Sequence, residues 1–98
     1  MKIHDLNCLL HLMYKNKDII SFDEIYNYFN DFVEAYSKKA YKKIIEKSLY
    51  NSNDIIQESW LKIWLFISTE HVVMRSLAEF YEYLNGVVDD VIIELNNN

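Results

Sequence analysis

The chain has 98 residues, with a single glycine, Gly86, and no proline. Proline interrupts helices because it lacks an amide hydrogen, and glycine is the residue that most readily adopts the left-handed backbone of tight turns. Residues 1–85 contain neither of these interruptions. The sequence therefore predicts helices that are joined by short polar connections.

The composition limits the class of protein. Hydrophobic residues make up 51% of the chain and aromatic residues 15%, far from the polar composition of disordered chains. A chain of this length holds one core, so we expect a single domain over residues 1–98. Cys8 is the only cysteine and excludes an internal disulfide, and we find neither a signal peptide nor a membrane-spanning apolar segment. We expect a cytoplasmic protein.

Apolar residues at helical spacing predict the first two helices. The first helix covers residues 2–15. The second begins at a capping box of Ser21 and Glu24, because the hydroxyl and carboxylate supply acceptors for free amides, and extends to about Lys47. The apolar face of this helix is predicted to contain Ile25, Phe29, Phe32, Tyr36, Ala40 and Ile44.

Two further helices follow. Residues 51–53 offer capping side chains for the third helix. Its buried stripe is predicted to be Ile56, Trp60, Ile63, Trp64 and Ile67. Ser76 and Glu79 repeat the capping-box pattern before the fourth helix, whose apolar face is Phe80, Leu84, Val87, Val91 and Leu95. Its β-branched residues make a strand the competing interpretation, but no neighbouring strand candidate exists, so we expect an all-α fold, a compact bundle of about four helices.

The net charge of −5 is unevenly distributed. Residues 1–62 carry nine acids and nine bases, whereas residues 63–98 carry six acids and only Arg75 as a base. An acidic surface of this kind repels a phosphate backbone. A basic cluster precedes it, formed by Lys38, Lys39, Lys42, Lys43 and Lys47. Such a cluster attracts nucleic acid, but it is more often the solvated side of an amphipathic helix.

Enzymatic and metal chemistry is poorly represented in this sequence. One glycine cannot build a phosphate-binding loop. His4, Cys8 and His11 share one helical face at a spacing that suits zinc, but no fourth ligand accompanies them, and coincidence is the better interpretation. Cys8 beside a histidine also lacks oxyanion donors for nucleophilic catalysis. We expect no enzyme activity, no metal and no cofactor.

Residues 53–64, NDIIQESWLKIW, carry a resemblance to a known family. They resemble the second conserved region of sigma-seventy-type bacterial sigma factors, whose pattern is an acid, two aliphatics, Gln-Glu, a variable residue, an aromatic, Leu, a base, an aliphatic and Trp. Residues 22–26, FDEIY, are similar to that family's opening helices. Residues 80–84, FYEYL, are similar to its Phe-x-x-Trp-Leu, with Tyr83 where the promoter-facing tryptophan is expected. The resemblance covers roughly residues 10–95.

The resemblance implies a helical bundle whose Gln-Glu helix docks on the clamp helices of the largest RNA polymerase subunit. The polymerase contacts would be Asp54, Gln57, Glu58 and Lys62. Carboxylates and an amide on one exposed helical face accept hydrogen bonds from arginines of a partner helix, although a solvated polar stripe is the usual meaning of such residues taken alone. Candidates for nucleic-acid contact are Lys38, Lys39, Lys42, Lys43, Tyr81 and Tyr83.

Two departures from the family pattern qualify this function. Where the family has bases and an asparagine that face melted promoter DNA, this chain has Asp89, Asp90 and Glu94, which disfavours promoter melting by this chain alone. The chain also has no room for the usual helix-turn-helix domain, so either it is a fragment or a companion protein supplies that domain.

We therefore expect a transcription-initiation protein: a divided, truncated or degenerate sigma factor that binds polymerase core. One alternative is a small acidic sigma-like or DNA-mimicking inhibitor of a host protein. Another is a helical interaction module that associates through its tyrosine-rich and tryptophan-rich surface.

Overall fold

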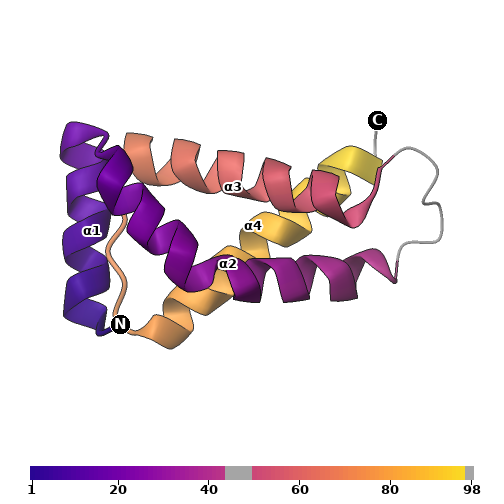
Figure 1. Ribbon diagram of the computed structural model, residues 1–98, viewed down its shortest axis with the longest axis horizontal. Helices are drawn as coiled ribbons and strands as arrows, with labels where there is room; N and C mark the ends of the chain where they lie inside the picture. Colours follow the sequence, from indigo (N-terminus) through magenta and orange to yellow (C-terminus); the bar gives the residue numbers. More distant parts are fainter. Residues whose placement is uncertain (44–49, 97–98) are drawn as a thin grey trace.

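The computed structural model describes residues 1–43 and 50–96, and its helices are α1 (Ile3–Asn16), α2 (Ile19–Tyr41), α3 (Ser52–Thr69) and α4 (Leu77–Asn96). This described part contains no strand. The helices form one body of 40 × 22 × 19 Å, in which α2 and α3 run lengthwise, α4 crosses them obliquely and α1 stands across one end (Figure 1). The predicted all-α bundle is confirmed. No helix in the described ranges has both the length and the apolarity needed to cross a membrane.

The turn between α1 and α2 forms without glycine. Lys17 adopts the left-handed backbone conformation, with φ of 52°, and its amide donates to the Met13 carbonyl at 3.0 Å. The Lys17 ammonium donates to the carbonyl of Tyr14 at 2.8 Å and also to that of Ser68 at the end of α3. These contacts offset the strain of a non-glycine residue in this conformation.

Asp18, and not Ser21, caps the start of α2. The Asp18 carboxylate accepts hydrogen bonds from the amide of Ile20 at 3.2 Å and from the hydroxyl of Ser21 at 2.7 Å. The predicted capping box of Ser21 and Glu24 is therefore wrong. Asp18 supplies the acceptor three residues earlier, which places Ser21 inside the helix, where it is buried.

The second helix is also shorter than predicted within the described residues. It ends at Tyr41, and Lys42 and Lys43 form a turn. The rest of the predicted continuation to Lys47, which includes the expected apolar position Ile44, lies outside the described residues.

The predicted cap of α3 is present, and so is the Ser76 half of the capping box predicted for α4. The amide of Asp54 donates to the Asn51 side chain at 3.0 Å, and the amide of Asn51 donates to the Asp54 carboxylate at 2.8 Å, which completes a capping box. The Ser76 hydroxyl accepts from the amide of Glu79 at 3.1 Å before α4. Local sequence therefore determines where these two helices begin.

One hydrophobic core joins all the helices, and Phe29 of α2 lies within it, only 1% exposed. The Phe29 ring meets Phe80 and Tyr81 of α4 edge to face, with ring centroids 4.8 and 5.4 Å apart. The buried apolar residues of the core are Leu6, Leu10, Met13, Ile25, Phe29, Val33, Ile55, Trp60, Ile63, Ile67, Met74, Phe80, Leu84, Val87, Val88 and Val91.

The predicted apolar faces are correct in direction but shifted at some positions. On α2, Phe32 and Tyr36 are half-buried while Val33 is fully buried. On α3, Ile55 is buried and the predicted Ile56 is only half-buried. Helical periodicity identifies a face, whereas the neighbouring helices decide its centre.

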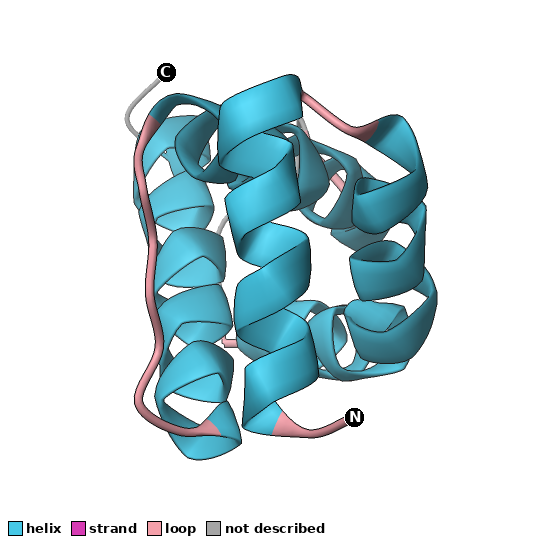
Figure 2. Ribbon diagram, turned by 90° about the vertical axis from the view of Figure 1, so that its left-hand side faces the viewer, coloured by secondary structure: helices cyan, strands magenta, loops and turns pink. Residues whose placement is uncertain are grey.

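The connection between α3 and α4 lies against α1 (Figure 2). The Asn7 side chain donates to the Met74 carbonyl at 2.8 Å and accepts from the Met74 amide at 2.9 Å. The His71 ring stacks on Tyr14 at 5.2 Å and meets His11 at 5.6 Å. These contacts hold an extended backbone segment in place over α1.

We predict that Phe29→Ala lowers the free energy of unfolding by about 3–5 kcal/mol, because it removes the ring contacts to α4 and leaves a cavity. Urea denaturation followed by circular dichroism measures the loss. The control Ile93→Ala, at a side chain that is 57% exposed, should change stability by less than about 0.5 kcal/mol. Equal effects of the two substitutions would contradict the position of Phe29 in the core.

Candidate functional site

The orientation of α3 decides which of its side chains face outward. Ile55, Ile63 and Ile67 point into the core and are at most 1% exposed. Trp60 is 6% exposed, and its indole N–H donates to the Asn30 side-chain oxygen of α2 at 2.9 Å. Because a buried indole N–H needs an acceptor, this bond and the apolar contacts together determine the rotation of α3 about its axis.

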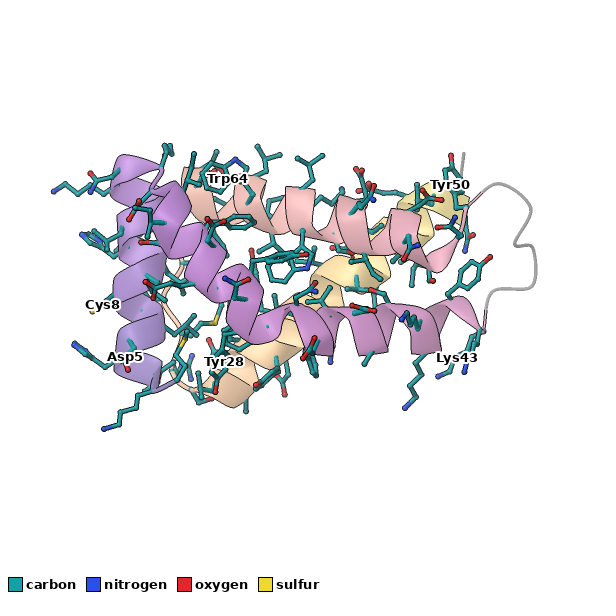
Figure 3. All side chains as sticks on the ribbon, in the orientation of Figure 1. Asp5, Cys8, Tyr28, Lys43, Tyr50 and Trp64 are labelled. Atoms are coloured by element: carbon teal, nitrogen blue, oxygen red, sulfur yellow. The ribbon has the colours of Figure 1, made fainter. Side chains whose placement is uncertain are left out.

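Aromatic rings join α3 to the first half of α2. The Phe22 ring lies 5.9 Å from Trp60 and 5.1 Å from Trp64, edge to face in both pairs. The Tyr26 ring lies 4.9 Å from Trp60. Trp64 sits on α3 toward the end of the bundle that α1 occupies (Figure 3). These contacts cover the α2-facing side of α3, and α4 packs against another side of the helix.

The predicted polymerase-binding residues Asp54 and Gln57 are exposed on α3, and Glu58 is half-buried. Asp54 also serves the capping box through one carboxylate oxygen, and its remaining acceptor positions can bind a second partner. The structure thus brings two carboxylates and an amide to one outward side within the first two turns of the helix. Such a group accepts charge-assisted hydrogen bonds from arginine or lysine.

Lys62, the fourth predicted contact, has an intramolecular partner. Its ammonium donates to the Glu94 carboxylate of α4, and its side chain is only 19% exposed. Lys62 therefore links α3 to α4 in the free protein. Sequence alone does not show this pair because Lys62 and Glu94 are 32 residues apart.

Two exposed apolar residues on α3, Leu61 and Leu65, were not among the predicted site residues. Their side chains are 59% and 54% exposed. Each follows a predicted docking residue, Asp54 or Glu58, by seven residues, which returns an α-helix to nearly the same side. That seven-residue spacing is the sequence signal that would have identified them.

The lysines proposed to contact nucleic acid lie at the end of α2. Lys38 pairs with Glu34 at 2.8 Å, while Lys39, Lys42 and Lys43 are exposed. Lys43 and Tyr50 both lie at the end of the bundle far from α1 (Figure 3). These lysines form a small basic surface at that end.

Tyr81 lies apart from this basic surface. Its ring meets Phe32 at 4.6 Å and Phe29 at 5.4 Å. Phe32 precedes the end of α2 at Tyr41 by nine residues, which is about 14 Å along a helix, and Lys42 and Lys43 follow that end. The structure thus separates the predicted aromatic contacts from most of the predicted basic ones.

Tyr83 is largely enclosed by protein. Its ring stacks on Phe80 at 5.9 Å, and its buried hydroxyl has no hydrogen-bond partner among the described residues. Burial, with a smaller contribution from the charge of Glu70, raises the pKa of Tyr83 to about 12. Its polar end is therefore turned inward, unlike a hydroxyl that meets solvent.

The outer side of α4 carries acidic residues. Asp89 accepts a hydrogen bond from the Tyr36 hydroxyl of α2 at 2.8 Å. Burial, and next the hydrogen bond and charge of Asp89, raise the pKa of Tyr36. Asp89, Asp90 and Glu94 are all exposed, so this side of the protein is strongly acidic.

The histidines and cysteine of α1 do not form a metal centre in the described part of the chain. The Cys8 thiol lies 3.6 Å from the His4 ring nitrogen, whereas the ring of His11 contacts His71 instead. Within these residues, no group of at least three His, Cys, Asp or Glu side chains could hold a metal ion. Cys8 also lines a shallow pocket of about 490 Å³ between α1 and α2.

No protein-family model matches this chain, and neither the curated proteins nor the solved structures that we searched contain a match. The resemblance of residues 53–64 to sigma factors therefore stays a prediction. The structural features that point to a function are the surface of α3 and the charge of the residues around it.

We predict that the stability of the protein falls as the pH rises from about 10 to about 12, because the pKa of Tyr83 is raised from 10.0 to about 12 in the folded state. The unfolded chain releases this proton first, so the stabilisation is complete below pH 10 and is lost as the pH passes through the folded pKa. In the Tyr83→Phe variant, the measured free energy of unfolding should fall less steeply with pH over this range than in the parent protein.

At neutral pH the Tyr83→Phe variant should stay within about 1 kcal/mol of the parent, because the substitution removes a buried hydroxyl that has no described partner. Tyr36→Phe, which retains Tyr83, serves as the comparison. An alkaline slope in Tyr83→Phe that equals that of the parent protein would contradict the assignment.

Proposed function

We propose that this chain is a non-enzymatic transcription-initiation protein that binds the core of bacterial RNA polymerase through α3. It acts as a divided or degenerate sigma factor, or as a sigma-like regulator. The observation that carries this proposal is the outward position of Asp54, Gln57 and Glu58, within the segment of the chain that resembles the polymerase-binding region of sigma factors.

Physical chemistry supports this surface as a protein contact. Hydrogen bonds to a charged group contribute about 1.5–3 kcal/mol each when the contact excludes water. The partner that the resemblance implies is the pair of clamp helices of the largest polymerase subunit. Lys62 takes part only if its pair with Glu94 opens or if its aliphatic stem contributes.

We also propose that a companion protein supplies promoter recognition in the bacterial cytoplasm. The acids of α4 repel the phosphate backbone near the helix that would face melted DNA. The exposed lysines Lys39, Lys42 and Lys43 offer a limited electrostatic contact to DNA, and they lie at the same end of the bundle as the C-terminal half of α4 (Figure 1). Tyr81 and Tyr83 would need to leave their packed positions to stack on a base.

The acidity of α4 favours a second candidate, an inhibitor that mimics a sigma surface or DNA. Residues 63–98 carry six acids and a single base, and Asp89, Asp90 and Glu94 lie exposed on one helix. A transcription assay with the resident sigma factor separates the two candidates. Stimulation of a promoter together with a companion subunit supports the first, and inhibition alone supports the second.

We predict that the double variant Gln57→Ala/Glu58→Ala binds purified core polymerase about a hundredfold more weakly, because it removes about 3 kcal/mol of hydrogen bonding. Biolayer interferometry measures the dissociation constant. Circular dichroism should show an unchanged fold, since Gln57 is exposed and Glu58 half-buried.

The matched control is Asp23→Ala/Asn27→Ala, which removes an acid and an amide from exposed positions of α2. It should leave the affinity for polymerase unchanged. If the Gln57→Ala/Glu58→Ala variant binds polymerase as tightly as this control, α3 is not the docking helix.

A further inference from the structure

The outward side of α3 carries a continuous stripe formed by Asp54, Glu58, Leu61 and Leu65, hereafter the α3 stripe. Its members are spaced by four, three and four residues, so they lie in one line along the helix. The first two are acidic, and the last two are leucines that are 59% and 54% exposed. The line therefore has a polar half followed by an apolar half.

The fold itself does not use these leucines. The inward side of α3 is complete with Ile55, Ile63 and Ile67, and its flanks pack against α2 and α4. Isolated exposed leucines are common on protein surfaces. Two of them one helical turn apart, in line with two carboxylates, form instead an amphipathic surface of the kind that meets another helix.

The spacing defines the geometry of such a contact. Asp54 and Leu61 are seven residues apart, as are Glu58 and Leu65, which is the repeat of a coiled-coil seam. The α3 stripe spans twelve residues, or about 16 Å from first to last. A partner helix packed along α3 would bury this whole length in about two heptads.

Charge decides what the partner carries. Lys62 is the only base in α3, and it is paired with Glu94 of α4. The carboxylates of Asp54 and Glu58 thus have no basic side chain of their own helix available to neutralise them. Complementarity requires arginine or lysine opposite this half of the stripe.

We propose that the α3 stripe binds one partner helix, which places basic side chains against Asp54 and Glu58 and apolar side chains against Leu61 and Leu65. This inference rests on the proposed function and deepens it, because it makes docking on polymerase depend on two leucines that were not among the predicted polymerase contacts. The acidic half provides attraction and register, and the apolar half provides the buried area that slows dissociation.

The test measures the affinity of full-length protein for purified core RNA polymerase of the organism that encodes it, at several salt concentrations. Leu61→Ser/Leu65→Ser should raise the dissociation constant at least about tenfold, because the contact would no longer remove two leucine side chains from water. It should leave the salt dependence of binding unchanged. Glu58→Gln should flatten the salt dependence, because it removes a screened charge contact. Ile93→Ser, at an exposed position of α4, is the matched control.

The outcomes separate the role of the two leucines from the proposed function. If Leu61→Ser/Leu65→Ser binds polymerase as tightly as Ile93→Ser while Gln57→Ala/Glu58→Ala does not, the inference about the leucines is wrong and the proposed function stands. If the parent protein does not bind core polymerase, both are wrong. If the leucine substitutions change only the sedimentation coefficient of the free protein, a second copy of the chain occupies the stripe and the proposed partner is overturned.

Discussion

The position of Trp60 is the constraint on which the rest of this structure depends. Its indole ring projects from α3 and packs against Phe22 and Tyr26 of α2, and its N–H donates to Asn30. A rotation of α3 about its axis would leave this buried donor without an acceptor, at a cost of about 1–3 kcal/mol. The direction of the outer side of α3, and with it the candidate docking surface, therefore follows from this buried polar contact together with the burial of Ile55, Ile63 and Ile67.

A second constraint comes from the connections between helices. The chain turns from α1 to α2 at Lys17, which has a positive φ without being glycine or asparagine, and its side chain binds carbonyls on α1 and α3. Asn7 binds both backbone groups of Met74 in the segment before α4. These side chains stabilise the connections between helices, because they supply hydrogen-bond partners to backbone groups at helix ends and outside helices. A chain with one glycine can thereby form a compact bundle.

Acidic residues occur on two separate helices of the surface, α3 and α4. The acids of α3 lie in line with exposed leucines, whereas the acids of α4 occupy the positions where the sigma-factor resemblance predicts DNA-facing bases. An acidic surface at those positions disfavours nucleic acid and is compatible with a protein partner. The proposals for polymerase docking and for a companion protein follow from this division.

The local sequence by itself determined the all-α class, the sequence ranges of α1, α3 and α4 to within a few residues, and the caps at Asn51 and Ser76, because these depend on side chains within one turn of each other. It also indicated that Asp54 and Gln57 lie outward, since apolar periodicity separates the sides of a helix. Only the tertiary structure decided that Ile55 is buried more deeply than Ile56 and that Lys62 pairs with Glu94. It also left Leu61 and Leu65 uncovered. Those outcomes depend on how residues from distant parts of the chain pack together, and one-dimensional periodicity contains no information about which neighbour covers each side of a helix.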